Sequence, residues 1–408
     1  MKRLHVLALA AILAAAGCGD DDDHHHDHDA APGGDAGGDG GADSACDVDS
    51  AGPPDELIYV SNADSGEVAV VNPRTCKVTA RIPVAEAQGE MNASPDGAWI
   101  FSPGGDSNDL LVLDAAAGAV DRRIEVGARP VHTFWAPDHA TFWVSNDQGA
   151  SVSVVDGATR EVIGTIAVGN GHHKMAFTAG DPYKVYVSNI SDGTISVIDG
   201  ATREVATTIT VSGGPHGIDF SSASGRVYNC GSAGIEVIAT EGGGADTLVD
   251  TIETPGGRCN YLHFDESGRY GWATSSAADA VYVVDAEDDT IVATIATGDG
   301  PDKVAFFEGD RAVVTSVFDT QVTVIDTVAG GALGAIPVGR AVPDGADSGH
   351  RSISRSLDGR HAYVPNAEDG TITIIDVQAR QVRGTVEVGG HPSGIGVVKD
   401  GEGLVYPR

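Results

Sequence analysis

Short apolar runs recur along this chain with a period close to 42 residues. Each run holds four to eight residues rich in Val, Ile, Thr and Tyr, and Gly, Asn, Asp or Pro separates it from the next run. One run in every unit ends at a position that is usually Asp, with Val, Ile or Ala six residues later. The eight positions are Asn72, Asp114, Asp156, Asp199, Ala239, Asp285, Asp326 and Asp376.

This periodicity predicts an all-β fold, a β-propeller built from four-stranded blades. A repeat near 42 residues that contains four strand-like runs is typical of a propeller blade. No helical period persists after residue 17. A single blade cannot bury its apolar face alone, so the blades must stack and the array must close on itself. We expect a structural role for the recurrent Asp, because its carboxylate can accept backbone N–H groups in the turn that follows.

The number of blades follows from counting the strand types. The second, third and fourth strands of the unit occur eight times, from residues 57–60 onward, but the first unit lacks an inner strand. A spare inner strand stands near the other end of the chain, at residues 391–400. We therefore predict eight blades, with this C-terminal strand completing the first blade and removing open edges. Seven blades plus an irregular segment are the alternative.

The repeats also resemble those of a known family. The segments KVYVSN (184–189) and TISVIDGATREVATTITV (194–211) are similar to YVTN β-propeller repeats, which are typical of secreted and surface proteins of bacteria and archaea. The resemblance spans about residues 57–400. It implies the fold but little about function, because propellers carry many unrelated activities. Related propellers are the eight-bladed haem-binding domain of cytochrome nitrite reductase and the seven-bladed copper-cluster domain of nitrous oxide reductase.

Residues 1–17 have the composition of a signal peptide. A basic pair precedes an apolar stretch at residues 4–16, which is too short to span a bilayer. The small residues before Cys18 resemble a bacterial lipobox, although Ala15 stands where Leu is usual. The resemblance implies cleavage before Cys18 and lipid attachment to it. Because Gly19 rather than Asp follows the cysteine, it also implies the outer membrane of the cell envelope, facing either the periplasm or the surface. The alternative is an ordinary signal peptide cleaved nearby.

Residues 18–56 predict a tether between the lipid and a propeller at residues 57–408. This tether holds thirteen acidic and no basic residues, with Gly, Ala and Ser making up much of the rest. It cannot bury enough apolar surface to fold, so we expect it to be disordered. The net charge of −34 argues against nucleic acid as a partner. We expect a monomer whose partners are the membrane, through Cys18, and a protein or small molecule that the sequence does not identify.

Four further cysteines suit an exported chain that can form disulfides. Cys230 ends the second strand of one unit and Cys259 enters the inner strand of the next, so we expect both on the same face of neighbouring blades. Cys46 can reach back to Cys76 in the first unit. We predict the disulfides Cys46–Cys76 and Cys230–Cys259, with metal ligation by Cys230 or Cys259 as the alternative.

Seven of the nine histidines in the propeller fall where an inner strand begins. In a propeller this strand lines the central channel, and the turn before it forms the channel mouth. Neutral imidazoles that converge there are ligands for copper, zinc or haem iron, and Glu90 and Asp302 occupy the same position in two units. The alternative is structural, with each imidazole bonding a carbonyl of a neighbouring blade. The candidate metal ligands are His132, His172, His173, His216, His263, His350 and His391.

Two functional hypotheses follow. No Cys-X-X-Cys-His, Gly-X-Ser-X-Gly, His-Glu-X-X-His or phosphate-binding loop is present, so the sequence supports neither covalent c-type haem nor hydrolase or nucleotide chemistry. The first hypothesis is a lipid-anchored binding or scaffold module without catalysis, and no catalytic residue is assigned. The second is a metal-binding or redox protein that uses the histidine ring at the channel mouth, with copper or zinc as its cofactor.

Overall fold

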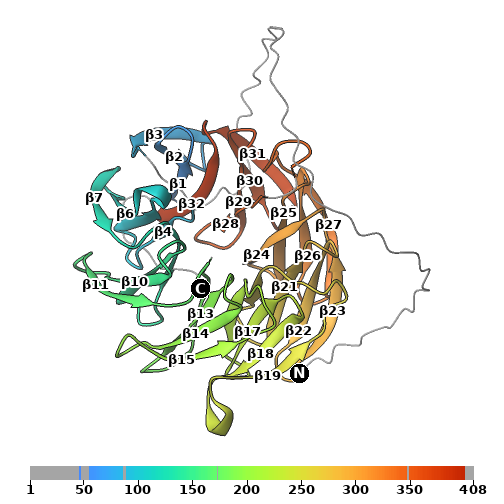
Figure 1. Ribbon diagram of the computed structural model, residues 1–408. Helices are drawn as coiled ribbons and strands as arrows, with labels where there is room; N and C mark the ends of the chain where they lie inside the picture. Colours follow the sequence, from blue (N-terminus) through green and yellow to red (C-terminus); the bar gives the residue numbers. More distant parts are fainter. Residues whose placement is uncertain (1–45, 47–54, 86–88, 172, 347–348, 400–408) are drawn as a thin grey trace, which may run out of the picture. The chain divides into compact units, whose positions relative to one another are not determined.

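The computed structural model describes Cys46 and residues 55–85, 89–171, 173–346 and 349–399. In this part the chain forms eight four-stranded antiparallel sheets, arranged as the blades of a ring (Figure 1). The only helical elements among the described residues are two short 3-10 turns, η1 (Gly105–Ser107) and η2 (Gly242–Gly244). The all-β propeller of eight blades expected from the sequence is confirmed. The predicted signal peptide, the predicted lipidation site Cys18 and most of the predicted tether lie outside the described residues.

The first four blades take up residues 56–210 and the last strand of the chain. Blade 1 contains β32 (Pro392–Lys399), β1 (Glu56–Asn62), β2 (Glu67–Asn72) and β3 (Lys77–Pro83). Blade 2 contains β4 (Asn92–Ala93), β5 (Trp99–Pro103), β6 (Asp109–Asp114) and β7 (Ala119–Glu125). Blade 3 contains β8 (Pro130–Trp135), β9 (Thr141–Asn146), β10 (Ser151–Asp156) and β11 (Val162–Ala167). Blade 4 contains β12 (Met175–Phe177), β13 (Lys184–Asn189), β14 (Thr194–Asp199) and β15 (Glu204–Thr210).

The other four blades follow in chain order. Blade 5 contains β16 (Ile218–Ser221), β17 (Arg226–Gly231), β18 (Gly234–Ala239) and β19 (Thr247–Ile252). Blade 6 contains β20 (Leu262–Phe264), β21 (Tyr270–Ser275), β22 (Ala280–Asp285) and β23 (Thr290–Ala296). Blade 7 contains β24 (Pro301–Phe307), β25 (Arg311–Ser316), β26 (Gln321–Asp326) and β27 (Gly331–Pro337). Blade 8 contains β28 (Ser354–Arg355), β29 (His361–Asn366), β30 (Thr371–Asp376) and β31 (Gln381–Glu387).

The ring is closed by a strand from the far end of the chain. Strand β32 pairs antiparallel with β1, so that Glu56 faces Lys399 and Val60 faces Ile395. Blade 1 therefore combines three strands from the start of the propeller with one from its end. This is the closure that the spare inner strand at residues 391–400 predicts, and it pairs the inner edge of β1.

The apolar core is divided into eight clusters, one between each pair of neighbouring blades. The last cluster packs Ile58 and Val60 of blade 1 against Ile372 and Ile374 of blade 8, all fully buried. Third strands such as β10 are buried almost throughout, whereas outermost strands such as β11 are exposed at most of their positions. Each fully buried Ile or Val contributes roughly 1.5–3 kcal/mol relative to exposure. Stability is thus distributed around the ring rather than held in one centre.

The recurrent Asp stabilises the turn between the third and fourth strands. In blade 3, Asp156 Oδ1 accepts the backbone N–H groups of Ala158 at 3.1 Å and Thr159 at 2.7 Å. Asp199 of blade 4 makes the same pair of bonds, as does Asn72 of blade 1. Blade 5 has Ala239 instead, and its turn contains η2. The structural role expected for the recurrent Asp is confirmed.

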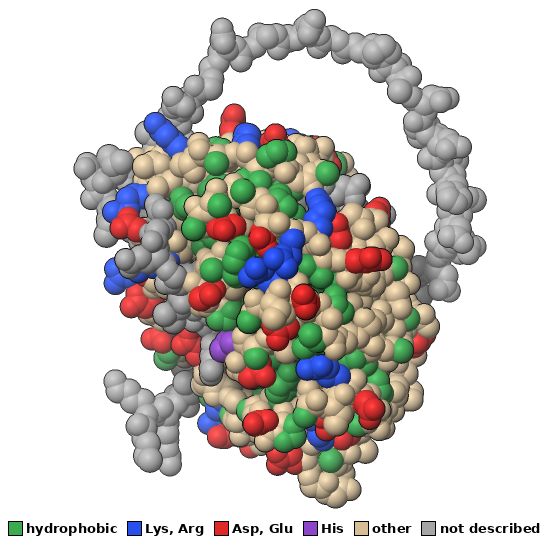
Figure 2. All heavy atoms as spheres, turned by 90° about the vertical axis from the view of Figure 1, so that its left-hand side faces the viewer, with side chains coloured by type: hydrophobic (Ala, Val, Ile, Leu, Met, Phe, Trp, Pro, Cys, Tyr) green, Lys and Arg blue, Asp and Glu red, His purple; other side chains and the backbone are tan. Residues whose placement is uncertain are grey.

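The outer face of the propeller carries charges of both signs. On the face shown in Figure 2, acidic and basic side chains are interspersed among apolar ones rather than gathered by sign. Pairs such as Arg123 Nη1 with Asp109 Oδ2, 2.9 Å apart, connect adjacent strands of one blade. Within the described ranges, no helix has the length and apolar character needed to cross a membrane.

Two disulfides join parts of the chain that the β-sheets leave separate. Cys46 is bonded to Cys76, which lies in the turn between β2 and β3, with their Cα atoms 5.6 Å apart. Cys230 of β17 is bonded to Cys259, just before β20, with a Cα separation of 5.1 Å. The first bond ties the segment before the propeller to blade 1, and the second connects blades 5 and 6. Both pairings are those that the sequence predicts.

Candidate functional site

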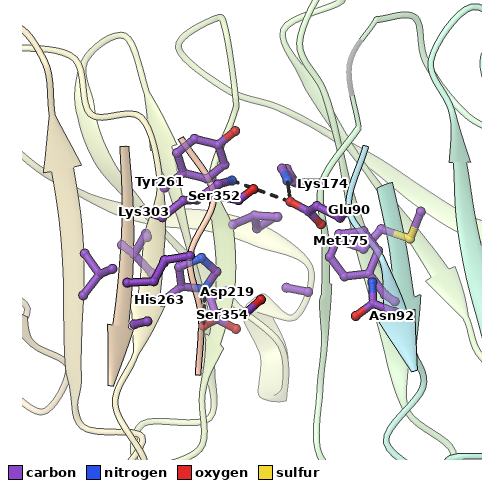
Figure 3. A pocket seen from close by; sticks show the side chains of 18 of the residues that line it. Glu90, Asn92, Lys174, Met175, Asp219, Tyr261, His263, Lys303, Ser352 and Ser354 are labelled. Atoms are coloured by element: carbon purple, nitrogen blue, oxygen red, sulfur yellow. Dashed lines mark hydrogen bonds and ion pairs between the residues drawn. The ribbon is translucent and has the colours of Figure 1, made fainter. Parts of the chain in front are cut away.

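A cavity of about 480 Å³ occupies the central channel. Residues of all eight blades line it, so its wall combines positions far apart in the sequence (Figure 3). This size and this mixture of apolar wall and a few polar groups are typical of small-molecule sites. The apolar lining residues are Met91, Phe134, Met175, Phe177, Ile218, Leu262, Val304, Ile353 and Ile395. The ionisable lining residues are Glu90, Lys174, Asp219, Tyr261, His263 and Lys303.

Glu90 holds two lysines together at one end of this cavity (Figure 3). The Nζ atoms of Lys174 and Lys303 lie 3.2 Å and 3.7 Å from the same carboxylate oxygen, Oε1. Glu90 precedes β4, Lys174 precedes β12 and Lys303 lies in β24, so the three charges come from blades 2, 4 and 7. The lysine side chains are only 9% and 15% exposed. Burying such a charge without a partner costs several kcal/mol per ion. The partners are available here because the closed ring brings blades 2, 4 and 7 together around the channel.

Two further side chains surround the lysines. Lys174 Nζ lies 2.9 Å from His132 Nδ1, and the same ring nitrogen lies 3.5 Å from Glu90 Oε2. Lys303 Nζ lies 3.3 Å from the centroid of the Tyr261 ring, a cation–π contact. The Glu90 oxygen, at 3.7 Å, is beyond hydrogen-bond distance from Lys303. Because an ammonium group has three N–H donors, Lys303 keeps donor capacity toward the cavity.

The surroundings of Lys174, Lys303 and Glu90 shift their three pKa values in different directions. Burial lowers the pKa of Lys174 to about 8, although Glu90 favours its charged form. Burial also disfavours the charge of Lys303, but Tyr261, Asp302 and Glu90 outweigh it and raise that pKa above the usual value. Burial works against ionised Glu90, yet the neighbouring Lys174 and His132 hold its pKa well below the ordinary range. At neutral pH, Lys174 is therefore the member of this trio that releases a proton most readily.

A second polar group lines the cavity on blades 5 and 6. Asp219 accepts backbone N–H groups from Phe220 at 2.8 Å and Phe264 at 2.9 Å. Its Oδ2 lies 3.9 Å from Nδ1 of His263. Burial raises the pKa of Asp219 to about 6, and burial together with Lys303 and Lys174 lowers the pKa of His263 to about 4. At pH 7 the imidazole is therefore neutral and faces the cavity as a hydrogen-bonding group.

A third polar group holds the segment that leads into blade 8. Asp302 Oδ2 accepts the backbone N–H of Arg351 at 2.6 Å, and His350 Nδ1 lies 3.6 Å from the same oxygen. Asp302 precedes Lys303 directly in β24, so its position also sets that of the lysine. His350 and Asp302 were both expected at the channel mouth, and the structure brings them together as an acid–imidazole pair.

Three other candidate histidines contact neighbouring groups of the chain. His173 Nδ1 lies 3.0 Å from the carbonyl oxygen of Ser188, and His216 Nδ1 lies 2.9 Å from that of Asn260 in the next blade. The His216 contact is the structural alternative to metal ligation named above, whereas His173 contacts a carbonyl of its own blade. His391 Nδ1 lies 4.0 Å from an oxygen of Asp64.

The structure does not gather a metal centre from the side chains that it describes. Among the described residues, no group of three or more His, Cys, Asp or Glu side chains is placed to hold a metal ion. His172 lies outside the described residues. The metal site that includes the pair His172 and His173 therefore stays a prediction.

The most distinctive feature of the cavity, its two lysines, was not predicted from the sequence. Glu90 and Asp302 were expected at the right place, but as oxygen ligands for a metal. The signal that could have revealed them is a rare residue type at equivalent positions of two repeats. Lysine occurs only six times in 408 residues, yet Lys174 and Lys303 both fall at the start of an inner strand.

Comparisons with known proteins agree with the fold. Residues 77–233 match the YNCE-like beta-propeller family. No curated protein matches the sequence. Among solved structures, the dihydro-heme d1 dehydrogenase NirN in complex with DHE superposes with a TM-score of 0.66 at 17% identity, covering 83% of this chain and 74% of that one. Apo AztD from Citrobacter koseri gives 0.65 at 16% identity, covering 88% and 100%. Identities this low support a common fold and nothing finer.

Proposed function

We propose that this protein is a binding module of the bacterial cell envelope, attached to a membrane through Cys18, whose channel cavity takes a small organic carboxylate. The observation that carries the proposal is the end of the cavity at Lys303. A buried ammonium there keeps donor capacity, and the Glu90 oxygen is beyond hydrogen-bond distance from it. A carboxylate oxygen is the natural acceptor for such a donor, because charge-assisted hydrogen bonds are the stronger ones.

The rest of the cavity suits the body of such a ligand. Phe134 and Phe177 offer aromatic faces, and Ile218 and Val304 offer aliphatic surface. Neutral His263 supplies one further hydrogen-bonding group on this wall. A volume of about 480 Å³ accommodates a small aromatic or branched acid rather than a large cofactor.

Two features of the sequence support the location in the envelope. The stretch before Cys18 resembles a lipobox, and the acidic segment that follows suits a spacer. The disulfides Cys46–Cys76 and Cys230–Cys259 suit an oxidising compartment. The closed ring holds the cavity walls in fixed positions. The proposed role is therefore the binding of a ligand, without catalysis.

Calorimetry with a matched pair of probes tests the proposal. We expect 3-phenylpropanoate to bind and its neutral amide, 3-phenylpropanamide, to bind more weakly. A hydrogen bond to a charged group is worth about 1.5–3 kcal/mol, or roughly 10- to 100-fold in affinity. Lys303→Met should remove this preference, whereas Lys77→Met on exposed β3 should leave it unchanged. Equal binding of acid and amide, or no binding of either, contradicts the proposal.

A further inference from the structure

We infer that Lys174 is a nucleophilic amine that captures the carbonyl group of a 2-oxo carboxylate as an imine, while Lys303 holds the carboxylate of the same molecule. The inference rests on the proposed function, since it names the chemical class that the channel cavity takes. Nothing in the fold requires two lysines at the inner-strand positions of blades 4 and 7. Their placement on one cavity therefore points to a ligand with two groups to contact.

The first argument concerns the charge balance of the cluster. Lys174 and Lys303 share the single carboxylate oxygen Glu90 Oε1. If Lys174 loses its proton, Glu90 keeps Lys303 as its counter-ion, so no buried charge is left alone. Two ammonium groups around one carboxylate also repel each other, which adds to the effect of burial. With a pKa of about 8, roughly a tenth of Lys174 is the free amine at pH 7.

The second argument concerns proton transfer. Imine formation requires a group that takes the ammonium proton and later returns one to the departing oxygen. Lys174 Nζ lies 2.9 Å from His132 Nδ1 and 3.2 Å from Glu90 Oε1. The imidazole nitrogen is the nearer of the two, and in the tautomer that carries its proton on Nε2 it accepts the ammonium proton. Both partners are within the reach that general acid–base transfer needs.

The reaction balances with these groups alone. Lys174 passes a proton to His132 and its nitrogen lone pair forms a bond to the carbonyl carbon, while the π electrons move to oxygen. A second proton then passes from the attacking nitrogen to this oxygen and gives the carbinolamine. The carbinolamine then loses this hydroxyl with a proton from His132 as water, and a C=N bond replaces the C–O bond. No electrons leave or enter the molecule, so neither oxidant nor reductant is needed. The step is reversible by hydrolysis, which suits capture and release.

The choice of a 2-oxo acid follows from the distances. Both lysine nitrogens approach one oxygen, so a single small molecule can touch both. In a 2-oxo carboxylate the carbonyl carbon is bonded directly to the carboxylate carbon, which places the two reacting groups as neighbours. The side chain of the acid then extends toward Phe134, Phe177 and Ile218.

Reductive trapping with site mapping tests the inference. The purified full-length chain is incubated with phenylpyruvate and sodium cyanoborohydride, digested, and searched by mass spectrometry for modified lysines. The exposed Lys77 is the internal reference, because its amine is open to solvent. We expect modification of Lys174 to exceed that of Lys77 by about tenfold or more at pH 7. Equal modification of the two lysines, or an unmodified Lys174, overturns the inference.

Variants separate this inference from the proposed function. Lys174→Arg should abolish trapping at the site while 3-phenylpropanoate, which has no carbonyl group to capture, still binds. Lys303→Met should reduce trapping of phenylpyruvate about tenfold more than it reduces trapping of the uncharged phenylacetaldehyde, because only the acid loses its carboxylate contact. If 3-phenylpropanoate binds and phenylpyruvate is not trapped, the binding function stands and the imine does not form. If neither probe binds, the proposed function fails first.

Discussion

The carboxyl group of Glu56 makes the stability of the ring depend on pH. Glu56 lies in β1 beside the closing strand β32 and is only 1% exposed. Its Oε2 accepts the backbone N–H of Leu357 at 2.8 Å, and its Oε1 accepts the hydroxyl of Tyr363. Both partners belong to blade 8, so Glu56 connects the two blades that meet where the ring closes. Burial raises its pKa from the usual 4.5 to about 7.

The direction and size of the effect follow from this shift. Between pH 4.5 and about 7 the folded protein keeps a proton on Glu56 that the unfolded chain has already released. The folded state is therefore favoured at the lower end of this window and loses that advantage as pH rises through it. A tenfold change in proton affinity equals 1.36 kcal/mol, so the loss is about 3 kcal/mol by pH 8.

Glu56→Gln is the variant that isolates this contribution. The amide oxygen can accept from Leu357 and the amide nitrogen can donate to Tyr363, so Gln imitates the protonated acid. Urea unfolding of both proteins from pH 4 to pH 8, followed by tryptophan fluorescence, gives the difference in unfolding free energy. We expect a difference near zero at pH 4 that grows in favour of the variant by about 2–3 kcal/mol at pH 8. The other titrating groups are common to both proteins and cancel. A difference that stays flat with pH refutes the reasoning.

Three shorter predictions concern closure, cross-linking and attachment. A chain that ends at Gly390 lacks β32, and we expect it to lose cooperative thermal unfolding at the full-length temperature, as calorimetry will show. Replacing Cys230 and Cys259 by Ser should lower the unfolding free energy by about 2–4 kcal/mol in urea titrations. As a control, dithiothreitol, which reduces disulfides, should lower the unfolding free energy of the parent protein. Cys18→Ser should move the protein from the membrane fraction to the soluble fraction on immunoblots, and unchanged partition would contradict lipid attachment at that residue.

Much of the fold could be predicted because the determining signals are local and repeated. The turn formed by Asp156 and its equivalents recurs in seven of the eight units with Asp or Asn, which gave the period and the number of blades. The inner strand at residues 391–400 had no partner in its own unit, so the chain itself indicated the closure. Cys230 and Cys259 could be paired because the same strand positions recur in neighbouring blades.

The contacts in the cavity could not be predicted from the sequence, because they form between side chains of different blades. The repeat shows that His132, Lys174 and Lys303 stand near inner-strand starts, but not that Lys174 contacts His132 or shares Glu90 with Lys303. Those contacts depend on side-chain directions across the channel. The excess of histidine at these positions was real, yet His173 and His216 lie against backbone carbonyls.

The closed ring and the charged cluster depend on each other. Glu90, Lys174 and Lys303 come from blades 2, 4 and 7, so Glu90 of one blade balances lysines of two others. Asp302 of blade 7 adds to the balance at Lys303. Burying each ion has a cost that its partners across the channel help to offset, so removing one member weakens the ring. Natural chains retain such buried groups more readily where they serve a ligand than where an apolar side chain would do. Blade 1 lines the same cavity with Ile395 and blade 8 with Ile353. The buried charges of Glu90, Lys174 and Lys303 are therefore the strongest physical reason to place function in the channel.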